Sequence, residues 1–142
     1  MVNLMDKVRP FSQALDRLRN AGLRPTRQRL ALAKLLFDDH DRHITAEILH
    51  GEALDANVRV SLATVYNTLH QFNEAGLLRE IVVDSGRSYF DTNVSDHHHI
   101  FNEDSRELMD IKDGEIGLAG MPAIGTGQEI SRIDVIVRVK NN

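Results

Sequence analysis

The chain has 142 residues, 42% of them hydrophobic, so it can bury a core in one ordinary domain or in two small ones. It has no cysteine, which excludes disulfides, thiolate zinc sites and cysteine nucleophiles, so nitrogen and oxygen atoms must hold any metal. No apolar stretch approaches the roughly 20 residues that cross a bilayer, and the N-terminus lacks the pattern of a signal peptide, so we expect a cytoplasmic protein with no membrane partner.

The net charge of −4 is unevenly distributed along the chain. Residues 7–34 hold eight Lys or Arg against one acidic residue, whereas residues 95–142 hold five basic residues against nine acidic ones. A local excess of positive charge is typical of contact with a nucleic-acid backbone, and a solvated surface is an equally good explanation of the charge alone. The basic end therefore makes DNA a candidate partner.

The first part of the chain predicts four helices, because apolar residues recur at helical spacing in four segments. Thr26, Thr45 and Ser61 precede three of these helices and can act as N-caps. Gly22 suits the left-handed position after the first helix, and the fourth must end near Gly76. The four segments cover residues 10–22, 24–39, 43–54 and 58–78.

The fourth segment is the most informative, because its two faces differ. Leu62, Val65, Leu69 and Phe72 recur at spacings of three, four and three, which predicts a core face. The opposite face has small, hydrogen-bonding and aromatic side chains, which suit insertion into a DNA major groove, and an ordinary polar surface is the alternative. That second face consists of Ala63, Thr64, Tyr66, Asn67 and His70.

Strand-like periodicity follows the fourth helix and predicts a hairpin. Residues 77–83 and 88–91 form its strands, and Gly86 lies in the turn. Helices followed by such a hairpin are typical of a winged helix-turn-helix, in which the last helix reads DNA and the wing touches the backbone. Arg87, near the wing tip, is placed for a phosphate contact.

The remaining residues predict a small second sheet. Short strands are expected around 97–101 and 107–111, and a closing strand over 132–140. Five of the nine glycines lie between 114 and 127, so we expect a poor or short helix there. Three strands alone would be marginally stable, so pairing with a second copy is expected, and a homodimer would offer two recognition helices to two DNA half-sites.

The predicted fold class is therefore α+β. We expect a winged-helix DNA-binding domain over residues 1–92, followed by a small α/β dimerisation domain with a short antiparallel sheet over 93–142.

Three consecutive histidines, His97, His98 and His99, lie well inside the chain, so they are not an affinity tag. In a strand, His97 and His99 would project to one side and could share an ion, while His98 would face the other side. Adjacent imidazoles are also suitable axial ligands for haem iron. A solvated loop without any ligand is the alternative.

Four stretches occur in a specific order: RPTRQRLALAKLLF, HITAEIL, SLATVYNTLHQFNEAGLL, and the segment from SYFD to HHH. From about residue 20 to 111, their order and spacing resemble the ferric uptake regulator family of metal-responsive transcription factors. Asn67 stands where many members have arginine. This departure, the HHHIF run and the missing cysteines look like the iron response regulator branch, whose members sense haem.

The resemblance implies a metal site at the junction of the two domains. Many relatives also carry a cysteine-bound structural zinc, which this chain cannot hold because it has no cysteine. Its imidazoles and carboxylates suit Fe(II), Mn(II) or Zn(II), and haem would compete for His97, His98 and His99. The implied metal ligands are His43, Asp91, His97, His99 and Asp110. By this resemblance and by charge, the expected DNA contacts are Arg24, Arg27, Arg29, Arg59, Ser61, Ala63, Thr64, Tyr66, Asn67 and Arg87.

The sequence thus predicts a homodimeric transcription regulator of iron homeostasis that binds double-stranded DNA, a repressor whose DNA binding haem reduces. The alternative within the same family is a repressor activated by Fe, Mn or Zn. A small metal-dependent hydrolase or oxygenase is a different possibility, but no separate base or nucleophile is grouped with the histidines. A winged helix that binds only proteins is another, and salt-dependent DNA binding would distinguish it.

Overall fold

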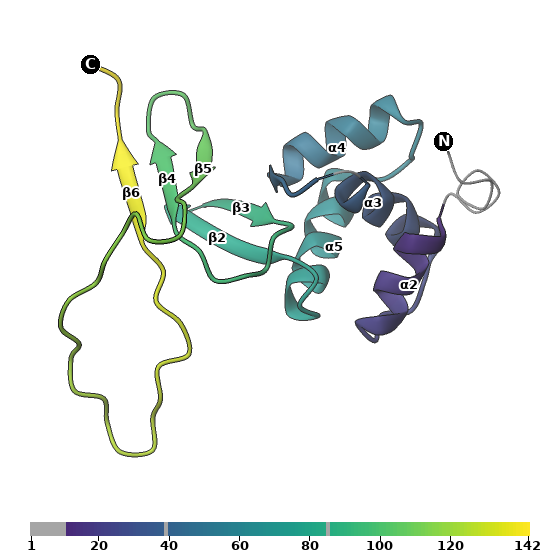
Figure 1. The fold of residues 1–142 in the computed structure, drawn as a ribbon. Helices are drawn as coiled ribbons and strands as arrows, with labels where there is room; N and C mark the ends of the chain where they lie inside the picture. The colour runs from purple at the N-terminus through teal and green to yellow at the C-terminus, as the bar shows by residue number, and fades with distance from the viewer. Residues whose placement is uncertain (1–10, 39, 85) are drawn as a thin grey trace, which may run out of the picture. The chain divides into compact units, whose positions relative to one another are not determined.

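The computed structural model describes residues 11–38, 40–84 and 86–142, so Lys7 and Arg9 of the basic run lie outside the described residues. The chain divides into two compact units, one ending at Val94 and one covering Ser95–Asn142, and each contains a three-stranded sheet (Figure 1). Within the described part of the chain, no helix is both long and apolar enough to cross a membrane.

Four helices form most of the first unit: α2 (Ser12–Asn20), α3 (Arg27–Phe37), α4 (Ala46–Asp55) and α5 (Leu62–Glu74). The three predicted N-caps are confirmed. Thr26 and Thr45 each accept a hydrogen bond from a backbone N–H three residues later at 3.2 Å, and Ser61 does so at 3.1 Å. Each cap satisfies a backbone donor that the first helical turn leaves without a partner.

The predicted end of α5 is confirmed at Gly76, which adopts a φ of +81°. The N–H of Leu77 donates to the carbonyl of Phe72 at 2.9 Å, and the N–H of Gly76 donates to that of Asn73 at 3.1 Å. This is the hydrogen-bond pattern of a Schellman motif, in which glycine is favoured because it has no Cβ to clash at positive φ. The turn leads the chain from α5 into the wing.

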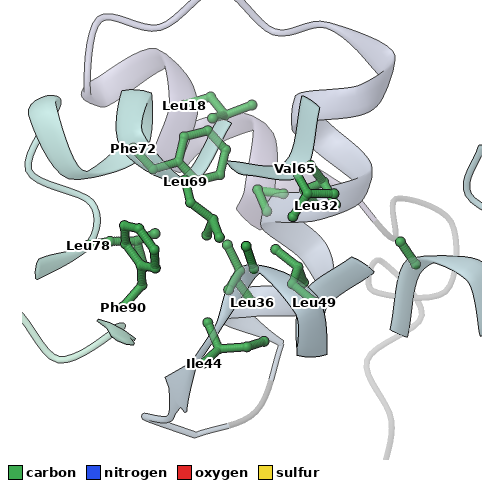
Figure 2. Packing of buried hydrophobic residues seen from close by; sticks show 14 residues of the cluster. Leu18, Leu32, Leu36, Ile44, Leu49, Val65, Leu69, Phe72, Leu78 and Phe90 are labelled. Carbon is green, nitrogen blue, oxygen red and sulfur yellow. The ribbon is translucent and has the colours of Figure 1, made fainter. Parts of the chain in front are cut away.

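The core of the first unit lies where the helices meet (Figure 2). Val65, Leu69 and Phe72 of α5 are fully buried, as predicted, but Leu62 is 40% exposed. The buried stripe starts one turn later and includes Thr68, because Leu62 is the first residue of the helix and lies outside the packed cluster. Each large side chain buried here contributes about 1.5–3 kcal/mol to stability.

The wing sheet contains three strands, β1 (His43–Ile44), β2 (Arg79–Asp84) and β3 (Arg87–Asp91), in the order β1-β3-β2. The predicted hairpin is confirmed as the antiparallel pair β2–β3. The sequence did not predict β1, a two-residue strand that pairs with β3 and places His43 opposite Asp91. Its formation depends on a partner almost fifty residues away, so no local pattern could reveal it.

The second unit contains β4 (His99–Asn102), β5 (Leu108–Asp110) and β6 (Ile136–Val139), in the order β5-β4-β6. The predicted α+β class is confirmed, but two details differ. The β4–β6 pair is parallel, so the sheet is mixed rather than antiparallel. Residues 111–135 form an open connection with no helix, because Gly114, Gly120 and Gly127 adopt positive φ values that a right-handed helix excludes (Figure 1).

Candidate metal centre and nucleic-acid interface

The first unit brings together one imidazole and one carboxylate of the expected ligand set. His43 and Asp91 are register partners across β1 and β3, and His43 Nε2 lies 3.1 Å from Asp91 Oδ2. Asp91 is only 1% exposed, and its Oδ1 accepts a hydrogen bond from the N–H of Asn93 at 2.9 Å. A carboxylate that is so buried needs positive charge beside it, because desolvation of an unpaired ion is costly.

The second unit brings together the other three expected ligands. His99 and Asp110 are register partners across β4 and β5, and His97 lies two residues before His99, the first residue of β4. His97 Nε2 lies 3.1 Å from Asp110 Oδ1, and His99 Nε2 lies 3.4 Å from the same oxygen. The three candidate ligand atoms lie within 4.8 Å of one another, so they converge on one point.

A hydrogen bond to the backbone orients the ring of His97 in this cluster. Its Nδ1 lies 2.7 Å from the carbonyl oxygen of Ser95, an acceptor, so Nδ1 carries a proton. In a neutral ring Nε2 then has a lone pair, which would face the Asp110 carboxylate. That lone pair could bind a cation, and a carbonyl that fixes the ring in this way is typical of metal-binding histidines.

His98 does not join the other two histidines. Its Nδ1 accepts a hydrogen bond from the N–H of Val135 at 3.1 Å, which ties the start of β4 to the chain just before β6. The prediction that His97 and His99 face one way and His98 another is therefore confirmed.

A cavity of about 250 Å³ lies beside His97 and His98 and is also lined by Lys112 and Arg132. It is smaller than the roughly 300–1,000 Å³ that pockets for drug-sized ligands occupy, and haem is at least that large. His99 is 2% exposed, so its ring has no open face for a flat macrocycle. The geometry of the triplet in this unit suits an ion better than haem.

The predicted DNA-reading face of α5 is accessible. Ala63 and Asn67 are exposed, and Tyr66 is 43% exposed. Ser61 and Thr64 hydrogen-bond to each other at the start of the helix. The Ser61 hydroxyl accepts from the N–H of Thr64 and donates to Thr64 Oγ1 at 3.0 Å. These two residues shape the beginning of the helix in addition to any DNA contact.

The predicted basic contacts have different surroundings. Arg24, Arg27 and Arg59 are exposed, and Arg87 lies at the wing tip, 3.8 Å from Asp84. Arg29 instead donates to the carbonyl of Arg24 and to Oε1 of Gln71, both at 2.9 Å, and so links α3 to α5. A cleft of about 420 Å³ lies between the start of α3 and one face of α5 and is lined by Arg24, Thr26, Gln28, Arg29, Thr64, Asn67, Thr68 and Gln71.

Sequence reasoning missed Ser95, Asn93 and Gln71, which orient the expected functional side chains. Ser95 acts through its backbone carbonyl, which no side-chain pattern marks. Gln71 lies on α5 at a polar position, and only the fold brings it to Arg29.

Comparison with known proteins identifies similar sequences and folds. The sequence profile described as "Ferric uptake regulator family" matches residues 20–135. The ferric uptake regulation protein of Vibrio cholerae serotype O1 is 34% identical over 100 residues, which cover 70% of this chain and 67% of that protein. The corresponding protein of Bordetella parapertussis is also 34% identical over 100 residues, covering 70% of this chain and 72% of its own length.

A solved structure of the ferric uptake regulator from Pseudomonas aeruginosa with manganese has a similar fold. Its TM-score is 0.70 at 27% sequence identity, and the match covers 90% of this chain and 97% of that chain.

Proposed function

This chain belongs to the ferric uptake regulator family, and from that premise we propose that it is a sequence-specific DNA-binding repressor of iron homeostasis activated by a divalent metal ion. Members of this family are metal-responsive transcription regulators, so the expectation that the chain is not an enzyme is confirmed. The observation that best supports metal activation is the convergence of His97, His99 and Asp110 on one point.

We propose that His43 and Asp91 complete this ligand set. Each group is already assembled within its own unit, and the family resemblance assigns both groups to one ion. Ligation by residues of two units would restrict the angle between them and so raise the fraction of molecules that fit the operator. Asp91, whose carboxylate is buried, and Asp110 would receive positive charge from an ion held there.

Fe(II) and Mn(II) are the first candidates, because imidazole and carboxylate donors suit both and the similar Pseudomonas aeruginosa structure contains manganese. The haem-responsive interpretation rests on the resemblance of the HHHIF run to the iron response regulator branch. The contacts of His98 and the buried ring of His99 favour the metal-activated alternative instead.

DNA is the proposed partner of the exposed face of α5 and of the arginines around the cleft. We propose that the protein acts as a homodimer in the cytoplasm, where its operator lies. The second unit supports dimerisation, because its small sheet leaves many large apolar side chains uncovered, and a second copy could bury them. These side chains are Met109, Leu118, Met121, Ile124, Ile130, Ile133 and Val137.

The test is operator affinity, measured by fluorescence anisotropy at fixed salt on a palindromic A·T-rich duplex. We expect Mn(II) to tighten binding by about 5- to 150-fold, the usual range for coupling between two sites. Asp110→Asn removes the shared carboxylate and should abolish this gain. Glu115→Gln, which changes an exposed carboxylate of the same unit, should retain it.

Haem is included as a separate ligand in the same titration. Release of DNA by haem with no response to Mn(II) would overturn metal activation in favour of haem sensing. Binding that is absent, or that does not weaken as salt rises, would overturn the DNA-binding function itself.

A further inference from the structure

Three aromatic rings follow one another from the DNA-reading face into the wing. Tyr66 and His70 are four residues apart on α5, so they share a helix face, and their ring centroids lie 4.7 Å apart. The His70 ring also contacts the ring of Phe90 in β3, with their centroids 5.5 Å apart and an interplanar angle of 86°. Phe90 is fully buried, whereas Tyr66 is 43% exposed, so the three rings lead from the core to the surface.

Strand β2 also holds the His70 ring. Glu80 Oε2 lies 3.3 Å from His70 Nδ1 and is a buried atom with no hydrogen-bond donor directed at it. The geometry of this contact is therefore not that of an aligned hydrogen bond. Glu80 is the register partner of Phe90, and its N–H donates to Oδ1 of Asn73 at 3.0 Å. His70 is thus contacted from both strands of the wing hairpin.

From these contacts we infer that His70 is a positioning residue that holds Tyr66 for the operator and couples it to strand β3. Phe90 directly precedes Asp91, the last residue of β3 and a proposed metal ligand. All four residues belong to the first unit, so the coupling needs no contact with the second. Ligation at Asp91 fixes the end of β3, and the close packing of Phe90, His70 and Tyr66 passes that constraint to α5.

This inference rests on the proposed function, because it needs both a DNA-reading α5 and metal ligation at Asp91. Positioning by His70 and a direct contact between His70 and DNA depend on different properties of the side chain. Positioning requires a flat ring between Phe90 and Tyr66. A direct contact requires a polar atom that reaches a base or a phosphate.

Two substitutions separate these roles. His70→Phe keeps a ring and removes both nitrogens, whereas His70→Gln keeps a polar side chain and removes the ring. Aromatic contacts of this kind correspond to about 2- to 10-fold in an equilibrium constant. We therefore expect His70→Gln to weaken operator binding by about that factor and to lose most of the Mn(II)-induced gain, while His70→Phe keeps both.

Two controls accompany these variants. His40→Ala removes an exposed histidine of the same unit and should behave as the unchanged protein. Thermal unfolding of each variant, followed by circular dichroism, shows whether affinity is lost without loss of the fold. A double-mutant cycle with Tyr66→Ala adds a direct measure, because the effects of His70→Gln and Tyr66→Ala should be much less than additive.

A spectroscopic signal tests the coupling without DNA. The chain has two tyrosines and no tryptophan, so in a Tyr89→Phe background Tyr66 is the only tyrosine. With 3-fluorotyrosine incorporated, the ¹⁹F resonance should shift when diamagnetic Zn(II) is added. The shift should persist in His70→Phe and disappear in His70→Gln.

The outcomes distinguish the inference from the proposed function. If the unchanged protein gains operator affinity with metal and His70→Gln keeps both that gain and the ¹⁹F shift, the role of His70 is overturned and metal activation stands. If His70→Phe loses affinity while His70→Gln keeps it, a direct polar contact replaces positioning. If metal leaves the affinity of the unchanged protein unaltered, metal activation and the coupling through His70 are both overturned.

Discussion

Arg27 and Arg29 lie two residues apart at the start of α3, yet their guanidinium groups have different surroundings. Arg27 is exposed, in keeping with a phosphate contact. Arg29 donates to the carbonyl of Arg24 and to Gln71, which fixes the start of α3 against α5. Positive charge along a sequence does not separate these roles, because the carbonyl and the amide that receive Arg29 are brought to it by the fold.

The difference predicts opposite results for two alanine variants. Arg29→Ala should lower stability by about 1 kcal/mol, because it removes hydrogen bonds of a charged but partly solvated group, and so lower the Tm by a few degrees. Arg27→Ala should leave the Tm unchanged and reduce the slope of log affinity against log salt by about one per subunit. Differential scanning calorimetry and salt-dependent anisotropy measure the two effects. Equal behaviour of both variants would contradict the assignment.

Helices are the elements that the sequence predicted best, and their ends explain why. A cap such as Thr45, or a left-handed glycine such as Gly76, acts on backbone groups within a few residues, so local chemistry is sufficient. Strand β1 and the exposure of Leu62 depend on partners distant in sequence. The same division applies to the site, where the sequence and its family resemblance supplied the candidate ligands but not the carbonyl of Ser95 that fixes His97.

Two glycines of the first unit allow a matched test of helix structure. Gly76 has positive φ, so Gly76→Ala should destabilise by about 1–2 kcal/mol through backbone strain. Gly51 lies inside α4 at an ordinary φ, and a Cβ there would meet no atom within 4 Å. Gly51→Ala should stabilise by about 0.5–1 kcal/mol, because alanine loses less conformational entropy in a helix. Urea unfolding midpoints that shift in the same direction would contradict this account.

The molecule as a whole combines a well-packed helical unit with a second unit that buries few of its apolar side chains. Fourteen buried residues form the core of the first unit, while the second unit buries Phe101, Leu108 and Ile111 and leaves more large apolar side chains exposed than it buries. The sequence predicted that this unit would be marginally stable alone, because it offers only three short strands. It could not predict the parallel pairing of β6, which depends on how the long connection returns to the sheet.

A charged substitution on β6 tests whether a second copy covers this unit. Val137 is 38% exposed, and Val137→Asp should weaken self-association by roughly 100-fold, because the dimer would bury a charge without a partner. Ile48 is 50% exposed on α4 in the first unit, so Ile48→Asp should leave association unchanged. Sedimentation equilibrium measures both variants. Dimers of equal strength would exclude β6 from the interface.

The open connection between β5 and β6 is much longer than the sheet requires. His99 is opposed by Asp110 on one side and by Ile136 on the other, so both ends of the connection leave the same end of β4. Two strand spacings separate those ends, about 10 Å, a distance that three or four extended residues could span. The chain uses 25 residues, from 111 to 135. Doubling the length of such a loop costs only about 0.6 kcal/mol in closure entropy, so insertions and deletions in the connection would leave the sheet intact.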